Sequence, residues 1–264
     1  MKEYLNVINA AINAGLEILE IYNSNDFEVS YKEGDMPLTR ADLAANQIIQ
    51  EVLETTNIPI ISEENKEINY STRKSWDTCW IVDPLDGTKE FIKRNGDFTV
   101  NIALIENGKP VFGVIYVPVS EELYIGDVKK QKSFKIKTNK EFEKLGELIY
   151  NYSEIKPSQE ANVIRVVGSK SHMNEETRQF VGDLQSTSNK PVEIVSRGSS
   201  LKFCLVASGE AQVYPRYAPT MEWDTAAGQA ICEAVGLKVI DQATQKPMLY
   251  NRENLLNSHF LVTA

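Results

Sequence analysis

The stretch Asp83-Pro84-Leu85-Asp86-Gly87-Thr88 places two carboxylates, a glycine and a hydroxyl directly after the short apolar run 80–82. The run predicts a buried strand, and the residues from Thr88 onward predict the first turn of a helix. Ligands of α/β proteins bind at the ends of strands. Gly87 lets a ligand approach the backbone closely, and the free N–H groups of a helix N-terminus bind phosphate oxygens. The stretch therefore predicts a phosphate site at the edge of an α/β sheet.

Further carboxylates lie on both sides of this stretch. Glu63-Glu64 follows the apolar run 58–61, and Asp224 lies at the start of a predicted helix. If the two apolar runs form adjacent strands, their carboxylates meet at one edge. Two unneutralised carboxylates about 4 Å apart repel each other by roughly 4 kcal/mol. Several such pairs would exceed the ~5–15 kcal/mol that stabilises a domain, so the grouping predicts a bound divalent cation.

Magnesium suits these ligands, because it prefers oxygen donors and keeps positions open for water and phosphate. Zinc is disfavoured: the two histidines, His172 and His259, lie far apart, and no thiol cluster accompanies them. A cation on one side of a phosphate and a helix N-terminus on the other is typical of two-metal phosphoryl chemistry.

Motifs of other enzyme classes are incomplete. Ser199-x-x-Lys202 matches one motif of the penicillin-binding enzymes, but their Ser-Asp-Asn and Lys-Thr-Gly motifs are absent. Two residues separate Asp83 from Asp86, whereas the nucleophile motif of haloacid dehalogenase phosphatases has one. The sequence contains neither a Walker loop nor Gly-x-Gly-x-x-Gly.

Hydrophobic periodicity predicts two groups of elements. In the first half, a helix over 5–22 and a second helix capped by Thr39 accompany short strands and a hairpin over 98–117. In the second half, strands and helices alternate, which predicts an α/β layer. The polar stretch 137–161 predicts a boundary between an N-terminal lobe, 1–150, and a C-terminal lobe, 151–264. The elements predicted in the second half are strands at 163–167, 192–195, 211–214 and 238–240 and helices at 175–184, 201–207 and 225–235.

Composition limits the class of protein. The 264 residues, 42% of them hydrophobic, are enough to bury a large core. The net charge of −9 argues against a non-specific nucleic-acid binder, whose affinity comes from neutralising phosphates. No stretch approaches the ~18 apolar residues of a membrane span, and no signal peptide is visible. The three cysteines, Cys79, Cys204 and Cys232, are predicted to be buried reduced thiols.

The order Asp42, Glu63-Glu64, Asp83 to Thr88 and Trp223-Asp224 resembles the signature of the lithium-sensitive, magnesium-dependent inositol monophosphatase superfamily over residues 39–228. Within it, the sequence is most similar to the 3′(2′),5′-bisphosphate nucleotidases of the CysQ type. The stretches that carry this second similarity are Lys89-Glu90-Phe91, 198–207, Tyr214-Pro215-Arg216 and 223–228. The resemblance implies a layered α/β/α/β/α sandwich.

The resemblance also implies a role for each matching residue. Two or three Mg²⁺ ions, with Mn²⁺ as a substitute, would bind to Glu63, Asp83, the Leu85 carbonyl, Asp86 and Asp224. Asp42 and Thr88 would align and deprotonate the attacking water, and Glu64 would orient a metal-bound water. The residues implied in substrate binding are Gly87, Thr88, Lys89, Ser169, His172, Ser199, Lys202, Arg216 and Asp224. Lys202 and Arg216 supply the local positive charge that a second phosphate needs in an acidic protein.

The implied reaction is hydrolysis of the 3′-phosphate of adenosine 3′,5′-bisphosphate to AMP, by in-line attack of metal-activated water and without a phospho-enzyme. In the family this reaction clears a by-product of sulfate activation, and the sulfated precursor is a second implied substrate. Hydrolysis of inositol 1-phosphate or of a sugar monophosphate is an alternative on the same scaffold. A sensor that binds the bisphosphate without hydrolysing it is another alternative. We expect a small-molecule partner and no nucleic acid, a monomer or homodimer, and a cytoplasmic protein. The resemblance also implies peripheral attachment to the inner membrane, which is known in the family and has no signal of its own in this sequence.

Overall fold

The computed structural model describes residues 2–24, 29–32, 36–138, 152–158, 162–168 and 174–263. At its centre is a seven-stranded sheet in the order β3-β4-β5-β6-β7-β8-β9. β3 and β4 pair in parallel, and each later pair of neighbours is antiparallel. The strands are β3 (Ile60–Ser62), β4 (Thr78–Asp86), β5 (Thr99–Glu106), β6 (Lys109–Val117), β7 (Glu122–Asp127), β8 (Lys132–Lys137) and β9 (Tyr152–Ile155).

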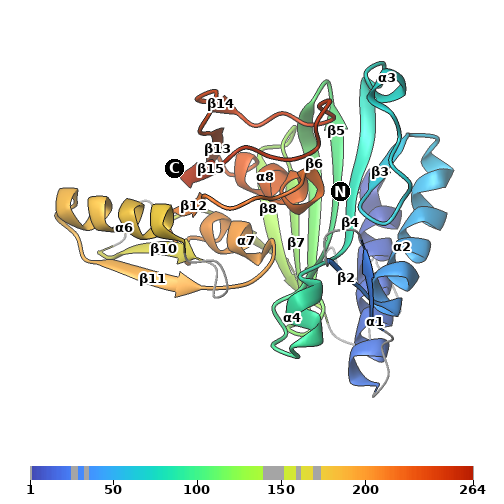
Figure 1. Ribbon diagram of the computed structural model, residues 1–264, viewed down its shortest axis with the longest axis horizontal. Coiled ribbons are helices and arrows are strands. Elements are labelled where there is room, and N and C mark those ends of the chain that lie inside the picture. Colours follow the sequence, from blue (N-terminus) through green and yellow to red (C-terminus); the bar gives the residue numbers. More distant parts are fainter. Residues whose placement is uncertain are drawn as a thin grey trace.

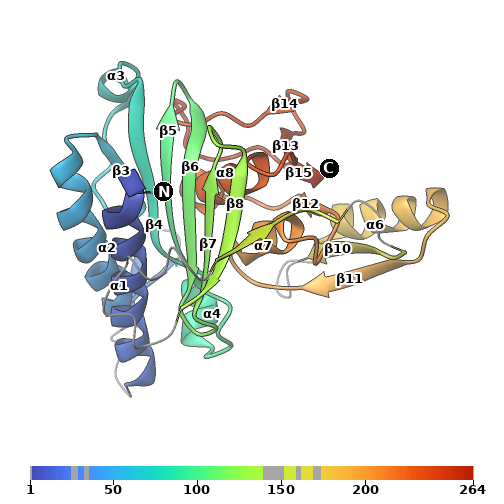
Figure 2. The same ribbon diagram turned by 180° about the vertical axis from the view of Figure 1, so that it is seen from behind.

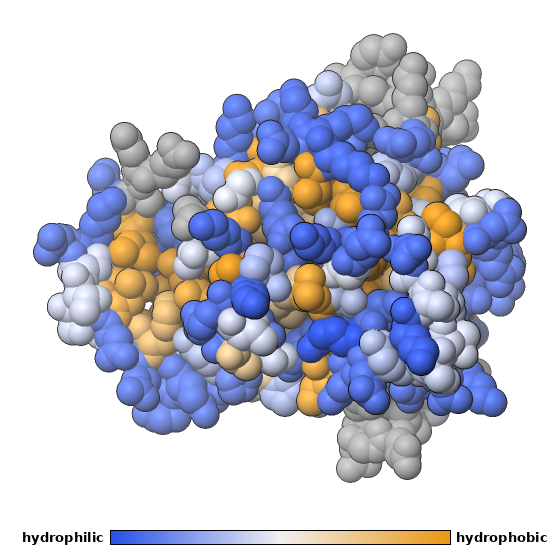
Figure 3. All heavy atoms as spheres, turned by 90° about the horizontal axis from the view of Figure 1, so that it is seen from above, coloured by the Kyte–Doolittle hydropathy of each residue, from blue (hydrophilic) through white to orange (hydrophobic). Residues whose placement is uncertain are grey.

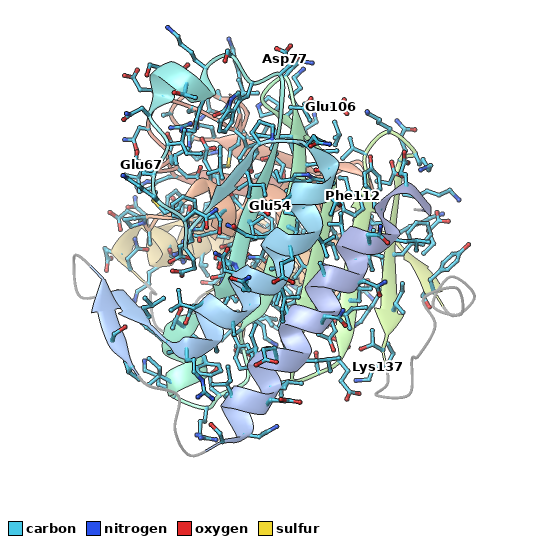
Figure 4. The ribbon with its side chains drawn as sticks, turned by 90° about the vertical axis from the view of Figure 1, so that its right-hand side faces the viewer. Glu54, Glu67, Asp77, Glu106, Phe112 and Lys137 are labelled. Carbon is cyan, nitrogen blue, oxygen red and sulfur yellow. The ribbon has the colours of Figure 1, made fainter. Side chains whose placement is uncertain are left out.

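Two long helices cover one face of this sheet. α1 (Leu5–Asn23) and α2 (Arg40–Leu53) lie side by side against β4, β5 and β6 (Figure 4). Their apolar stripes are buried, as periodicity predicts. Thr39 caps α2, and Asp42 completes the capping box by accepting a hydrogen bond from the Thr39 N–H. The predicted start of α2 is therefore confirmed.

The opposite face of the sheet packs against α8 (Ala226–Glu233), with α7 (Leu201–Ala207) beside it. Two glycines of the sheet allow this close contact. A Cβ at Gly126 on β7 would lie 2.5 Å from the Ile231 Cα, and a Cβ at Gly113 on β6 would clash with the Ala227 carbonyl. The backbone of α8 can therefore lie directly on the strands. This contact holds Asp224, which lies just before α8, in place relative to the central sheet.

A second β layer lies beyond these helices (Figures 1 and 2). It contains the four-stranded sheet β12-β15-β13-β14 and the parallel pair β10-β11, and α6 covers its outer side. The order helices, sheet, helices, sheet, helix confirms the predicted α/β/α/β/α sandwich. The elements are β10 (Ile164–Gly168), α6 (Glu175–Thr187), β11 (Val192–Ser196), β12 (Tyr214–Arg216), β13 (Lys238–Asp241), β14 (Lys246–Pro247) and β15 (Phe260–Thr263).

Short elements complete the described chain. They are β1 (Ser30–Lys32), β2 (Met36–Leu38), α3 (Tyr70–Arg73), α4 (Thr88–Ile92) and the 3₁₀ turns Lys2–Tyr4, Glu54–Thr56 and Glu222–Asp224. The predicted and observed elements differ at several points. The strand predicted at 211–214 begins at Tyr214, and β9 forms in the polar stretch 137–161, where it pairs with β8. The division into two lobes at residue 150 stays a prediction.

The surface and the cysteines agree with the composition. All three thiols are buried and free, as predicted. Hydrophilic side chains cover much of the face in Figure 3, with smaller apolar areas between them. Among the described residues, no helix combines the length and the apolar character needed to cross a bilayer.

Candidate metal centre

The parallel pair β3 and β4 brings the first carboxylates together. Ser62 lies opposite Val82 in the register, so Glu63 and Asp83 follow at the same edge, and the Glu63 N–H donates to the Val82 carbonyl (3.2 Å). The β4–β5 register shifts between Asp83 and Asp86, which indicates a bulge there. Within it, the Leu85 N–H donates to Asp83 Oδ1 (3.1 Å).

Asp224 reaches this edge from the other half of the chain. It ends the 3₁₀ turn before α8, and its carboxylate accepts a hydrogen bond from the Met221 N–H (2.8 Å). One carboxylate oxygen each of Asp83, Asp86 and Asp224 lies within 4.8 Å of the others. Three residues far apart in the sequence thus form one acidic cluster.

Two members of the cluster, Asp83 and Asp224, have raised pKa values. Burial and the neighbouring carboxylates, Glu63 first among them, raise the pKa of Asp83 well above its ordinary value. Burial and the Asp86 carboxylate raise the pKa of Asp224 to about 8. In both cases burial makes the largest contribution to the raised pKa, and the neighbouring carboxylates add to it.

A hydroxyl–carboxylate pair lies beside the cluster. Asp42, buried at the start of α2, accepts hydrogen bonds through Oδ2 from the Thr39 hydroxyl (2.6 Å) and N–H (2.7 Å). Its Oδ1 accepts from the Thr88 hydroxyl (3.1 Å), which also lies 3.4 Å from the Leu85 carbonyl. The structure therefore joins Asp42 and Thr88, the two residues expected to act on water.

A pocket adjoins the cluster on the side of α7. Its lining includes Gly87, Ser199, Lys202, Arg216 and Asp224, all expected in substrate binding. Lys202 is only 4% exposed and donates to the Ser199 carbonyl (2.6 Å). Burial and the nearby Arg216 lower the pKa of Lys202 to about 8. Among the described residues, Arg216 Nε is buried without a hydrogen-bond partner.

The other expected residues are placed differently. Lys89 is exposed on α4 and does not line this pocket, whereas its neighbour Glu90 does. Glu64 lies in the loop after β3, where its N–H faces the Ser62 hydroxyl (3.4 Å). Ser169 and His172 lie outside the described residues.

Sequence reasoning missed the hydroxyls that surround Asp86. Ser200, one residue from the expected Ser199, donates to Asp86 Oδ2 through its N–H (2.6 Å) and lies 2.7 Å away with its hydroxyl. Asn101 and Thr99 extend this network from β5. Only the repeat Ser199-Ser200 in a motif already singled out pointed to Ser200, and no local pattern marked the two β5 residues.

Comparison with known proteins decides the family. The sequence profile that describes the inositol monophosphatase family matches residues 1–262 of this chain. The chain belongs to the inositol monophosphatase family. A 3′(2′),5′-bisphosphate nucleotidase CysQ from Salmonella typhimurium is 43% identical to it, over 97% of this chain and 98% of that protein.

Solved structures agree with the family. The crystal structure of CysQ from Bacteroides thetaiotaomicron, a bacterial member of the inositol monophosphatase family, superposes with a TM-score of 0.89 and 46% identity, covering 100% of this chain and 97% of that one. The extragenic suppressor protein SuhB from Bartonella henselae shares the fold, with a TM-score of 0.77 at 22% identity over 100% of this chain and 94% of that one.

The donor set fits the metal dependence of the inositol monophosphatase family. The cluster offers carboxylate oxygens, the ligands of hard cations such as Mg²⁺ and Ca²⁺. The described histidine, His259, packs against the Tyr217 ring and lines a different pocket. Carboxylates that repel one another are stabilised when a cation binds between them.

Proposed function

We propose that the chain is a Mg²⁺-dependent 3′(2′),5′-bisphosphate nucleotidase that hydrolyses the 3′-phosphate of adenosine 3′,5′-bisphosphate to AMP. The proposal rests on the 41–43% identity to 3′(2′),5′-bisphosphate nucleotidases over 97% of this chain. The pocket supports it, because an acidic cluster and two basic side chains, Lys202 and Arg216, lie in one lining. A bisphosphate has one phosphate for the cations bound by the cluster and a second phosphate for these side chains.

In this proposal Glu63, Asp83, Asp86, Asp224 and the Leu85 carbonyl hold Mg²⁺. Bound there, Mg²⁺ supplies Lewis acidity that activates water and neutralises charge on the phosphate and the leaving oxygen.

The chain's own groups handle the proton of the attacking water. The Thr88 hydroxyl gives its hydrogen bond to Asp42 Oδ1, so a lone pair of its oxygen is free to accept a hydrogen bond from water. The Thr39 hydroxyl and N–H hold the Asp42 carboxylate in this orientation. Thr88 and Asp42 thus orient the water and receive its proton. Glu64 is proposed to orient a second water, and the backbone of Gly87 to contact the phosphate.

Substrate comparison tests the reaction. Phosphate release from adenosine 3′,5′-bisphosphate, its 5′-phosphosulfate analogue and inositol 1-phosphate is measured side by side, with Mg²⁺ and with EDTA. We expect Mg²⁺-dependent turnover of the adenosine bisphosphate. Turnover of inositol 1-phosphate alone would contradict the proposed substrate class. Tight binding of the bisphosphate without hydrolysis at saturating Mg²⁺ would identify a sensor instead.

Substitution of Lys202 tests the second phosphate contact. Lys202→Met keeps the buried apolar stem and removes the charge, so the KM for adenosine 3′,5′-bisphosphate should rise by ~10-fold or more, the loss of a charged hydrogen bond. Adenosine 3′-monophosphate lacks the second phosphate, and its KM should change little. Equal increases for both substrates would show that Lys202 acts through the Ser199 carbonyl that it holds.

A further inference from the structure

The Asp86 carboxylate is held from one side by neutral donors. Its Oδ2 lies 2.7 Å from the Ser199 hydroxyl, 2.6 Å from the Ser200 N–H and 2.7 Å from the Ser200 hydroxyl. The Asn101 amide lies at the limit of hydrogen-bond distance, 3.5 Å. A carboxylate oxygen has two lone-pair sites, so these donors saturate Oδ2. The described chain places no hydrogen-bond donor on Asp86 Oδ1.

The Ser200 hydroxyl also connects two distant segments. Its single proton is shared between the Asp224 carbonyl oxygen (2.6 Å) and Asp86 Oδ2 (2.7 Å), and Ser200 is only 2% exposed. The Asn101 Nδ2 donates to its oxygen (3.0 Å), and the Thr99 hydroxyl donates to Asn101 Oδ1 (2.9 Å). These buried groups form a chain of hydrogen bonds that runs from β5 to both carboxylate-bearing segments.

From this geometry we infer that Ser200, supported by Asn101, is a positioning residue that fixes the Asp86 carboxylate relative to Asp224 and presents Asp86 Oδ1 to the metal. The inference rests on the proposed function, because it takes Asp86 and Asp224 as metal ligands.

The reason is geometric. A carboxylate on a short side chain rotates about its last bond, and a divalent cation binds well only when its ligand oxygens are already in place. Donors on Oδ2 stop that rotation. The link from the Ser200 hydroxyl to the Asp224 carbonyl holds the 3₁₀ turn at a fixed distance from the end of β4. Partners that orient ligands in this way typically contribute ~10–100-fold to metal affinity.

Titration of the full-length protein with Mn²⁺ alone, followed by electron paramagnetic resonance of free Mn²⁺, tests the role without substrate. Ser200→Ala removes the hydroxyl and keeps the N–H donor to Asp86. We expect its Mn²⁺ dissociation constant to rise by ~10-fold or more. In assays, the Mg²⁺ concentration for half-maximal rate should rise in parallel, while the KM measured at saturating Mg²⁺ stays near that of the wild type.

Ser208→Ala is the matched control. Ser208 lies at the other end of α7, where its hydroxyl contacts Glu210, so this variant should bind Mn²⁺ like the wild type. Wild-type affinity in Ser200→Ala would overturn the inference. If Ser200→Ala does not fold, as judged by circular dichroism, Asn101→Ala removes the donor to the same hydroxyl and is held to the same criterion. A wild-type protein that binds no Mn²⁺ would instead refute the proposed metal dependence.

Discussion

At the scale of single residues, the burial of Asp83 has opposite consequences for activity and for stability. Asp83 is only 1% exposed, and its burial, together with the neighbouring carboxylates, raises its pKa. Asp83→Asn removes a proposed ligand, but it also removes a buried acid that must either repel its neighbours or hold a proton at a cost. Its amide oxygen can still accept from the Leu85 N–H. We expect kcat to fall by roughly 10³-fold or more, the loss of several kcal/mol of charge stabilisation.

The same substitution should raise the melting temperature of the metal-free protein. Relief of one like-charge contact corresponds to about 2–4 °C per kcal/mol in a protein of this size. Phosphate release with Mg²⁺ and differential scanning fluorimetry in EDTA measure the two effects. Asp183→Asn, on the exposed side of α6, should change neither. Near-normal turnover of Asp83→Asn would remove Asp83 from the proposed site.

The Thr88 hydroxyl gives a second prediction at this scale. Thr88→Val keeps the shape of the side chain and removes the hydrogen bond to Asp42, so proton transfer from water loses its orienting group. We expect kcat to fall by ~10²-fold or more, as for the loss of a general base, with little change in KM. Thr88→Ser retains the hydroxyl and should keep most of the activity. If Thr88→Val and Thr88→Ser have similar rates, the hydroxyl does not act on water.

At the scale of elements, the contact of α8 with the central sheet depends on glycine. A Cβ at Gly126 would meet the backbone of α8, so Gly126→Ala should destabilise the protein by about 1–3 kcal/mol through overpacking. Because the displaced helix follows Asp224, activity should fall as well. Gly182 on α6 has no atom near the position of an added Cβ, and Gly182→Ala should stabilise the helix by roughly 0.5–1 kcal/mol. Urea denaturation measures the free energy of unfolding of both variants. If Gly126→Ala is as stable as Gly182→Ala, α8 moves away from the added Cβ without cost.

The elements also show which parts of the fold a sequence can predict. Local signals were sufficient for α2, where the Thr39 cap and the apolar stripe lie within a few residues, and for the β5–β6 hairpin. β9 and β15 were missed because each has only four residues and forms by pairing with another strand: β9 with β8, across the polar stretch, and β15 with β12 and β13. Such a short segment becomes a strand because of the strands that it pairs with, and its own hydrophobic pattern is too short to predict it.

The site follows the same division. The carboxylates could be singled out because each ends an apolar run or lies in a recognisable motif. The contacts of Ser200 with Asp86 and Asp224 could not be predicted, since they join three segments that only the folded chain brings together. Lys89 is the opposite case: it lies in a recognisable motif, but its side chain does not line the pocket.

At the scale of the whole molecule, the acidic cluster links stability to pH and to metal. In the metal-free protein the pKa of Asp224 is raised to about 8 and that of Asp83 is raised well above its ordinary value, and burial raises the pKa of Glu222 to about 7. Between the unfolded pKa of a carboxyl, ~4, and these folded values, the folded state holds protons that the unfolded state releases. The free energy of unfolding therefore falls as pH rises through this interval.

A cation reverses this dependence, because it binds the ionised cluster and competes with the protons. The melting temperature in EDTA should therefore decline from pH 5 to pH 8, and the increase caused by saturating Mg²⁺ should grow over the same range, by at least ~3 °C if one kcal/mol is involved. Fluorimetry across this range, with EDTA and with Mg²⁺, measures both curves. Asp224→Asn removes one of the titrating groups and should flatten the EDTA curve. A metal-free protein whose melting temperature rises from pH 5 to pH 8 would show that the carboxylates are already ionised and stabilised by the fold alone.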